Sequence, residues 1–238
     1  MSMLRNVVAA VALSGSAALG LSMSVVTTVS AAEGGQKFSP GVAKALKEAQ
    51  DATKKSQWSV ALEKIKEAQA QSGKTAYDNY QIDNFLAYIL FSQKKMGEAA
   101  VVYERLLNSG QMPANEVDMR TKSLAQMYFQ LRQYDKAAKY AKPLYDKNPN
   151  QQDVALVLGQ SYYLLKDCKN AVSGMGARAT RTERAGKTPD EDWLRLVQDC
   201  QNRLNDKEGA NETLKKLVRH FNKPDDWHAL LTNARGRH

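Results

Sequence analysis

Apolar and small side chains recur at every third or fourth position through most of the chain after residue 40. Residues 124–150 (LAQMYFQLRQYDKAAKYAKPLYDKNPN) show the pattern most clearly, with one apolar face on each of two successive segments and Pro149 near the end of the second. This spacing is typical of amphipathic α-helices. The sequence therefore predicts an all-α protein whose helices come in pairs.

The same pattern returns 34 residues further along the chain. Three positions recur with that shift: Leu124 and Leu158, Tyr128 and Tyr162, and Ala137 and Ala171. Self-similarity at this period predicts a solenoid of stacked helix pairs. Alanines in the second helix of each pair place four pairs between residue 41 and about residue 180, and these alanines are Ala61, Ala99, Ala137 and Ala171.

The repeat resembles the tetratricopeptide repeat, whose signature is Trp-x2-Leu-Gly-x2-Tyr, then Ala-x3-Phe, then Pro, over about 34 residues. Leu158, Gly159 and Tyr162 match its first half, and Tyr134, Ala137 and Pro149 match its second half in the preceding repeat. Ala49 and Ala87 stand where glycine is usual, and no Trp starts the first four repeats. The resemblance implies a right-handed α-solenoid of about five antiparallel helix pairs.

The repeat pattern becomes weaker toward the carboxyl end. Residues 179–192 (ATRTERAGKTPDED) are interpreted as a polar, partly basic connector, and residues 193–204 and 210–221 as a fifth, divergent pair. We therefore assign residues 41–180 to repeats 1–4, and 181–238 to the divergent pair and a C-terminal segment. Because solenoids usually end in a polar capping helix, the apolar Trp227, Leu230 and Leu231 suggest either a longer array or a partner that covers them.

Residues 1–32 have the layout of a secretory signal peptide. One charge, Arg5, precedes an apolar run from Val7 to Val29, and small residues suit cleavage after Ala31 or Ala32. The alternative is a membrane anchor, since the run is long enough to span, but serine, glycine and threonine dilute it. We expect export to the periplasm, no membrane span after cleavage, and a short linker at residues 33–40.

The charge of the chain does not indicate a nucleic-acid partner. There are 34 Lys and Arg against 25 Asp and Glu, a formal net charge of +9, but the cations are scattered among acids. A binding tail would need a run of five or six like charges. Binding of an anionic polymer stays a minor alternative, and it predicts an affinity that falls steeply with salt.

No catalytic or metal-binding motif is present in the sequence. Its three histidines, His220, His228 and His238, lie near the end without the spacing of a metal site. Phosphate-binding loops, nucleophile elbows and zinc-protease motifs are absent. The sequence therefore predicts a protein without catalytic residues, metal or cofactor.

The two cysteines, Cys168 and Cys200, lie on helix ends that meet when antiparallel helices stack. An even cysteine count in an exported protein favours a structural disulfide. Two buried thiols are the alternative. A redox role is not indicated, because the CxxC spacing is absent.

The resemblance implies a concave groove lined by the first helix of each pair. The helical phase of that face selects, together with Leu156, the peptide-binding candidates Asn84, Tyr88, Phe91, Lys122, Gln126, Phe129, Gln160 and Tyr163. Amides and aromatic rings suit an extended peptide, although such aromatic stripes are also common in helix packing. Only Asn84 and Lys122 correspond to the carboxylate clamp of some family members.

Two functions follow from these expectations. The first is a non-enzymatic scaffold or adaptor in the periplasm that binds a peptide or protein in the groove. The second is a structural subunit of an envelope complex, or an oligomer, that assembles through its C-terminal end.

Overall fold

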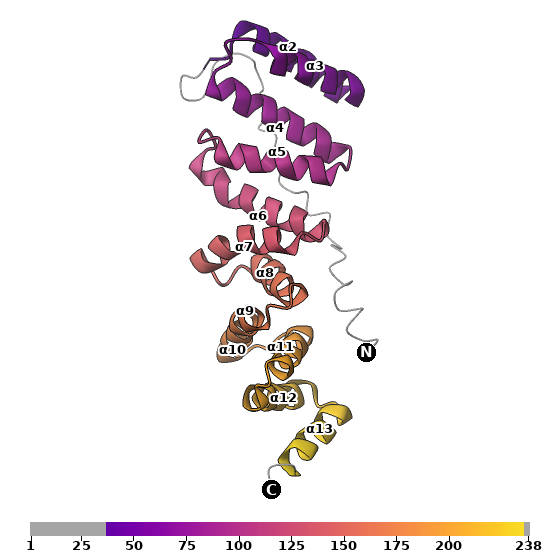
Figure 1. Cartoon of the computed structure of the whole chain (residues 1–238), viewed down its shortest axis with the longest axis vertical. Coiled ribbons are helices and arrows are strands. Elements are labelled where there is room, and N and C mark those ends of the chain that lie inside the picture. Colours follow the sequence, from indigo (N-terminus) through magenta and orange to yellow (C-terminus); the bar gives the residue numbers. More distant parts are fainter. Residues whose placement is uncertain (1–36, 236–238) are drawn as a thin grey trace. The chain divides into compact units, whose positions relative to one another are not determined.

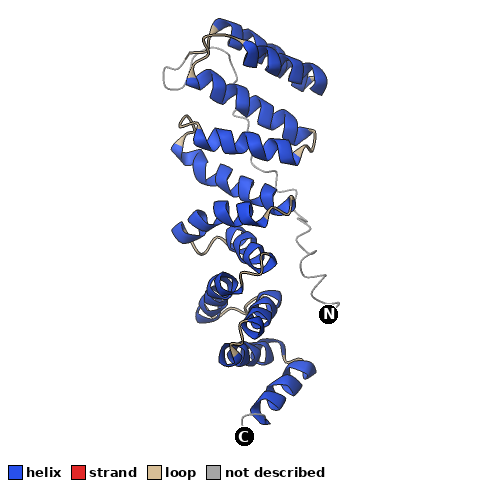
Figure 2. Ribbon diagram, in the orientation of Figure 1, coloured by secondary structure: helices blue, strands red, loops and turns tan. Residues whose placement is uncertain are grey.

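The computed structural model describes residues 37–235, which are built of α-helices joined by short turns (Figures 1 and 2). No strand occurs in this range. The expected signal peptide lies outside the described residues, as does the first half of the linker. The described chain forms two compact units, which divide between Leu131 and Arg132. Each unit is a stack of helix pairs, so the predicted all-α solenoid class is confirmed.

The first unit contains α2 (Pro40–Lys54), α3 (Trp58–Ala70), α4 (Ala76–Ser92), α5 (Met96–Asn108) and α6 (Ala114–Gln130). Helix α2 packs against α3, and both pack against α4, while α5 lies between α4 and α6. Small side chains lie at the closest approaches: Ala49, Ala61 and Ala87 are buried. Alanine therefore fills the place that glycine takes in the usual repeat.

Asp78 ties the start of α4 to the start of α2. Its carboxylate accepts hydrogen bonds from the Ser39 hydroxyl at 2.6 Å and from the backbone N–H of Thr75 at 2.9 Å. The Thr75 hydroxyl accepts the backbone N–H of Asp78 in return, which completes a capping box. Burial of Asp78 raises its pKa, but the hydrogen bonds from Ser39 and Thr75 outweigh it and hold the pKa below its usual value.

The turn inside each helix pair has one repeated geometry. A residue other than glycine takes a left-handed conformation at φ between 57° and 61° in each of them: Ser56, Lys94, Arg132, Lys166 and Asn205. The next backbone N–H then bonds the carbonyl five residues back, as Asp167 does to Tyr162 at 2.9 Å. This is the Schellman arrangement that satisfies the last carbonyls of a helix.

The second unit contains α7 (Tyr134–Lys147), α8 (Gln152–Leu164), α9 (Cys168–Ala171), η1 (Val172–Gly176), α10 (Ala177–Arg184), α11 (Glu191–Arg203), α12 (Lys207–Phe221) and α13 (Pro224–Arg235). Helices α9, η1 and α10 follow one another without a break and form the second helix of the fourth pair (Figure 1). This helix extends to Arg184, so the polar connector expected at residues 179–192 is corrected to a shorter segment.

A π-helical turn at η1 explains that correction. In the other second helices, the core positions are spaced by four and then three residues, as in Ala99, Tyr103 and Leu106. In the fourth pair, the buried residues are Ala171, Met175 and Ala179, spaced by four and four. The π-turn adds one residue to the helix, and the apolar repeat beyond it falls out of the expected phase.

Cys168 and Cys200 form the predicted disulfide, with their Cα atoms 4.9 Å apart. It joins α9 to α11, within a cluster that also contains Met175 and Leu196. Gly159 of α8 lies against the same cluster. A Cβ atom there would stand 2.5 Å from Cγ of Met175, so glycine is what allows α8 to approach η1 closely.

Helix α13 is attached to the second unit by only part of its surface. Leu230 packs against the buried cluster that contains Leu214 and Leu217 of α12, whereas Trp227 and Leu231 stay 45% and 55% exposed. The apolar face noted in the sequence is therefore only partly covered within the described residues. The hypothesis that something else covers it stays open.

Candidate functional site

The groove residues predicted on α4 lie on one helical face. Asn84, Tyr88 and Phe91 are spaced by four and three residues, and all three are half-buried. The opposite positions, Ile82 and Ile89, are buried in the core of the first unit. The helix therefore presents a continuous partly exposed face with an amide and two aromatic rings.

Tyr88 has a packing role in addition to its place on this face. Its ring lies 6.3 Å from that of Trp58 at an interplanar angle of 56°, and the two side chains cover the core formed by α2, α3 and α4. Such tilted contacts stabilise a fold beyond the area they bury. Phe91 has no ring contact of this kind among the described residues, so it is the better candidate for contact with a ligand.

On α6, the predicted residues Lys122, Gln126 and Phe129 are also half-buried and share one face. Their neighbours Ser123, Leu124 and Met127 are buried. The amides of Asn84 and Gln126 make no hydrogen bond within residues 37–235. Each amide offers two donors and one acceptor that a peptide backbone could use.

In the second unit, Gln160 and Tyr163 lie on α8 and are more deeply buried, at 7% and 8% exposure. Leu156, on the same face, packs on the disulfide cluster. The side-chain oxygen of Gln160 has no hydrogen-bond partner in the described part of the chain. An unpaired buried acceptor of this kind costs about 1–3 kcal/mol.

Tyr163 is held by a charged pair on α11. Its hydroxyl donates to Asp199 Oδ2 at 2.9 Å and accepts from Arg203 Nη2 at 3.2 Å. The two partners also form an ion pair at 2.7 Å. Burial, and then the hydrogen bond to Asp199, raise the pKa of Tyr163. The phenol is therefore neutral at physiological pH and already committed to these partners.

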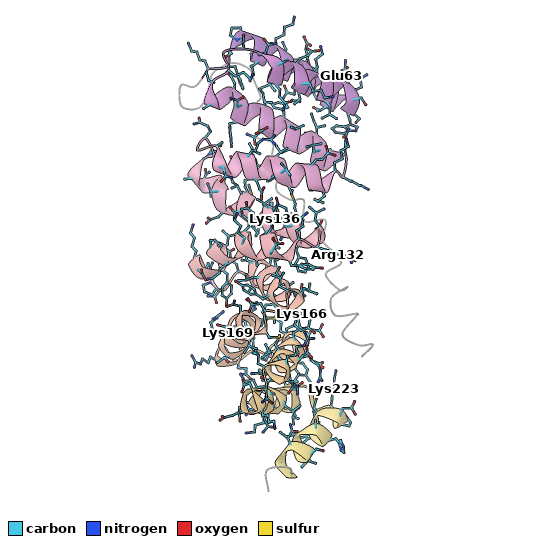
Figure 3. The ribbon with its side chains drawn as sticks, viewed as in Figure 1. Glu63, Arg132, Lys136, Lys166, Lys169 and Lys223 are labelled. Carbon is cyan, nitrogen blue, oxygen red and sulfur yellow. A yellow bond between two sulfur atoms is a disulfide. The ribbon has the colours of Figure 1, made fainter. Side chains whose placement is uncertain are left out.

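A second polar network on α11 was not predicted from the sequence. Arg195 makes two parallel hydrogen bonds to Asp226 of α13, at 2.7 and 2.8 Å, and pairs with Glu191 at 2.9 Å. Lys223, which is labelled in Figure 3, donates to the same Glu191 oxygen at 2.6 Å. These hydrogen bonds hold the pKa of Glu191 low against the opposing effect of burial. Extending the helical phase of the groove into α11 would have selected Arg195 and Asp199.

A surface hollow lies elsewhere in the second unit. A cavity of about 470 Å³ lies between α7 and the end of α8, and its lining includes Lys139, Lys142, Pro143, Tyr162 and Leu165. Lys142 is paired with Asp146 at 2.6 Å. Burial raises the pKa of Tyr162, so this phenol is neutral. The polar groups that line the cavity have no arrangement that indicates acid–base or nucleophilic chemistry.

Two further classes of site are absent from the described residues. Nowhere between residues 37 and 235 do three His, Cys, Asp or Glu side chains come close enough together to hold a metal ion. Within the same range, every helix is too short or too polar to cross a membrane.

Comparison with known sequences agrees with this arrangement of helix pairs. The tetratricopeptide repeat profile matches residues 46–115 and 123–186, which together make up more than half of the chain. The chain belongs to the tetratricopeptide repeat family. The tetratricopeptide repeat is a scaffold for protein–protein interaction.

Solved tetratricopeptide repeat structures resemble the chain at low sequence identity. The "MamA AMB-1" structure is 16% identical and covers 74% of this chain and 96% of its own, with a TM-score of 0.47. YrrB, described as a TPR protein with an unusual peptide-binding site, is 16% identical, with coverages of 79% and 96% and a TM-score of 0.49. A tetratricopeptide repeat protein from Parabacteroides merdae is 15% identical, with coverages of 82% and 73% and a TM-score of 0.45. No curated protein matched the chain.

Proposed function

We propose that this protein is a non-enzymatic scaffold of the periplasm that binds a peptide or protein partner on the groove face of its repeats. One observation carries the proposal. Asn84, Gln126 and Gln160, the amides of the predicted groove, make no hydrogen bond within residues 37–235. Polar groups that are partly or fully buried are normally paired, and the backbone of an extended peptide supplies both donors and acceptors.

The apolar part of the recognition falls to the aromatic residues of the same face. Phe91 and Phe129 are half-buried at equivalent repeat positions. Tyr163, the third member of this set, is already bound to Asp199 and Arg203. Binding therefore depends more on Phe91 than on the tyrosine, because partly exposed aromatic rings bury the most area on complex formation.

Site-specific photo-crosslinking tests the groove without disturbing the fold. A photoreactive phenylalanine derivative replaces Phe91 or, in the control, Val101 of α5, which is 50% exposed on the second helix of the same pair. We expect one partner to be crosslinked from position 91 and not from position 101. The Asn84→Ala, Gln126→Ala double variant should weaken that crosslink. Equal crosslinking from both positions would show that the groove is not the binding surface.

The periplasmic location rests on residues 1–32. We expect the protein purified from its host to begin at Ala32 or Glu33, because both cleavage positions follow small residues. Mass spectrometry of the intact protein measures the start directly. A chain that keeps Met1 and remains in the cytoplasmic fraction would contradict the location while leaving the groove untouched.

The exposed face of α13 favours a second candidate function, that of a structural subunit which assembles through this end. Trp227 and Leu231 would be buried on assembly. Deleting α13 would also remove Asp226, the ion-pair partner of Arg195. The Trp227→Ser, Leu231→Ser variant is therefore the sharper test. Its control replaces Val60 and Val101, which are exposed to a similar extent. Loss of the large complex in the first variant alone, measured by sedimentation, supports assembly.

A further inference from the structure

Arg178 and Arg181 lie on one face of α10, three residues apart and half-buried. The π-turn at η1 places them there. In an uninterrupted helix, Arg178 would take the core position that Leu106 and Leu217 take in their repeats, seven residues after the anchoring alanine. The extra residue of the π-turn brings Ala179 into that position instead, and Arg178 leaves the core.

Each of the two guanidinium groups lies on an aromatic ring. The guanidinium carbon of Arg178 is 4.6 Å from the ring centroid of Trp193, and that of Arg181 is 6.0 Å from the ring of Tyr145. Arg181 Nη2 also donates to the Tyr145 hydroxyl at 2.9 Å and to the Pro149 carbonyl at 3.4 Å. These contacts orient both side chains before any ligand arrives.

The hydroxyl of Tyr145 links Arg181 to the π-turn itself. It donates to the carbonyl oxygen of Gly174, inside η1, at 3.3 Å. The same carbonyl also accepts the backbone N–H of Ala177, so Tyr145 adds a second hydrogen bond to it. The same turn that moves Arg178 out of the core therefore also fixes the partner of Arg181.

Neither arginine has a carboxylate partner within 4.0 Å in the described part of the chain. The other buried or half-buried arginines there do: Arg120 pairs with Glu116, and Arg195 pairs with Glu191 and Asp226. Burial, and then the positive charge of Arg181, lower the pKa of Arg178. The structure thus holds two like charges near each other. Within the described residues, the Nε and Nη1 groups of Arg181 and all the side-chain N–H groups of Arg178 donate no hydrogen bond.

We propose that Arg178 and Arg181 form a binding site for a carboxylate carried by an acidic segment of a partner protein. Stacked guanidinium groups leave their N–H edges free, and these edges match the two oxygens of a carboxylate. Asp190, at the start of α11, also acts on Arg178 through its charge, but this effect is smaller than that of Arg181.

This site is separate from the predicted groove. Arg178 and Arg181 lie on α10, in the second helix of the fourth pair, whereas the predicted groove residues lie on the first helices α4, α6 and α8. A partner could use either surface alone. Loss of binding at Phe91 and loss of binding at the arginine pair are therefore distinguishable outcomes.

The test measures binding of a capped tetraglutamate peptide to the purified protein by calorimetry. The Arg178→Gln, Arg181→Gln variant should bind at least about tenfold more weakly, because it loses charge-assisted hydrogen bonds. The Arg178→Lys, Arg181→Lys variant keeps the charge but should also bind several-fold more weakly, since lysine cannot make the paired planar contact. The control is Arg132→Gln, Arg219→Gln, which removes the same charge from exposed, unstacked positions (Arg132 is labelled in Figure 3). Its affinity should stay within about twofold of the wild type.

Three outcomes would overturn the proposal. They are no uptake of peptide by the wild type at millimolar concentration, an equal loss of affinity in the control and Gln variants, and tighter binding of inorganic phosphate than of the peptide at equal ionic strength. The last result would identify a phosphate site. If the Gln variant shows a lowered melting temperature, the Lys variant decides, because it preserves the charge and much of the aliphatic packing.

Discussion

The disulfide between Cys168 and Cys200 makes a quantitative prediction about the stability of the second unit. The two residues are separated by 32 positions. Closing a loop of that length in the unfolded chain removes entropy worth about 3.5–4 kcal/mol at 25 °C in the chain-entropy model. Both side chains are buried, Cys200 completely. We therefore expect full reduction to lower the free energy of unfolding of this unit by about that amount.

Equilibrium urea unfolding, with and without a reductant, measures the loss. Trp193 is the natural probe, because it is buried in the cluster that surrounds the disulfide. Replacing Trp58 and Trp227 by phenylalanine leaves it as the sole tryptophan. Its fluorescence then reports on the second unit, which matters because a repeat protein need not unfold in one step.

The Cys168→Ala, Cys200→Ala variant supplies the control. It should resemble the reduced wild type, apart from about 1 kcal/mol for the lost sulfur atoms, and the reductant should not affect it. Two results would refute the reasoning: a shift of less than about 1 kcal/mol on reduction of the wild type, or an equal shift in the alanine variant. Either would mean that packing around α9 and α11, rather than the crosslink, sets the stability.

Three further predictions concern single positions. Lys166→Gly should stabilise the second unit by about 0.5–1 kcal/mol in thermal unfolding, because φ is 61° at Lys166 and glycine takes this left-handed conformation without strain. The control, Lys169→Gly within α9, should destabilise the unit (both residues are labelled in Figure 3). The lowered pKa of Asp78 means that its carboxylate stabilises the first unit above about pH 4 and that this contribution is lost as pH falls through the folded-state pKa. Asp78→Asn should therefore be less stable at pH 7 and show a smaller acid-induced loss. Arg195→Ala should speed amide hydrogen exchange in α13, because Asp226 loses both of its hydrogen bonds; unchanged protection would show that apolar packing alone holds this helix.

The helix pairs could be predicted because most of the second helices repeat the same three small or apolar positions. Ala99, Tyr103 and Leu106 show this spacing, and it recurs in four of the five second helices. A side chain on that face must pack against the facing helix, so the sequence pattern predicts directly which residues are buried. The disulfide followed from the same register, since Cys168 and Cys200 occupy helix ends that adjoin.

The polar contacts could be predicted much less well. The phase of the groove face selected Tyr163 as a ligand contact, yet its hydroxyl is bound to Asp199 and Arg203. The spacing of aromatic residues does not distinguish a ring that is available to bind a peptide from one that packs on a neighbouring side chain. Tyr88, which lies against Trp58, illustrates the same ambiguity. For this reason Phe91 carries more of the functional argument than the two tyrosines.

The π-turn at residues 172–176 shows how one inserted residue links fold and function. Periodicity alone predicts that the second helix of the fourth pair ends near Ala179, because the apolar positions after the π-turn are displaced by one residue. The same displacement removes Arg178 from the core position and sets it over Trp193. An arginine in the core would have required a carboxylate partner or cost several kcal/mol. The insertion avoids that cost and leaves a pair of oriented cations at the surface. Deleting Ser173 should restore the regular spacing, because Ala179 then falls seven residues after Ala171. Arg178 should therefore stay out of the core and the affinity for tetraglutamate should be kept, whereas Gly176 in place of Met175 at the position four residues after Ala171 should lower the stability of this unit.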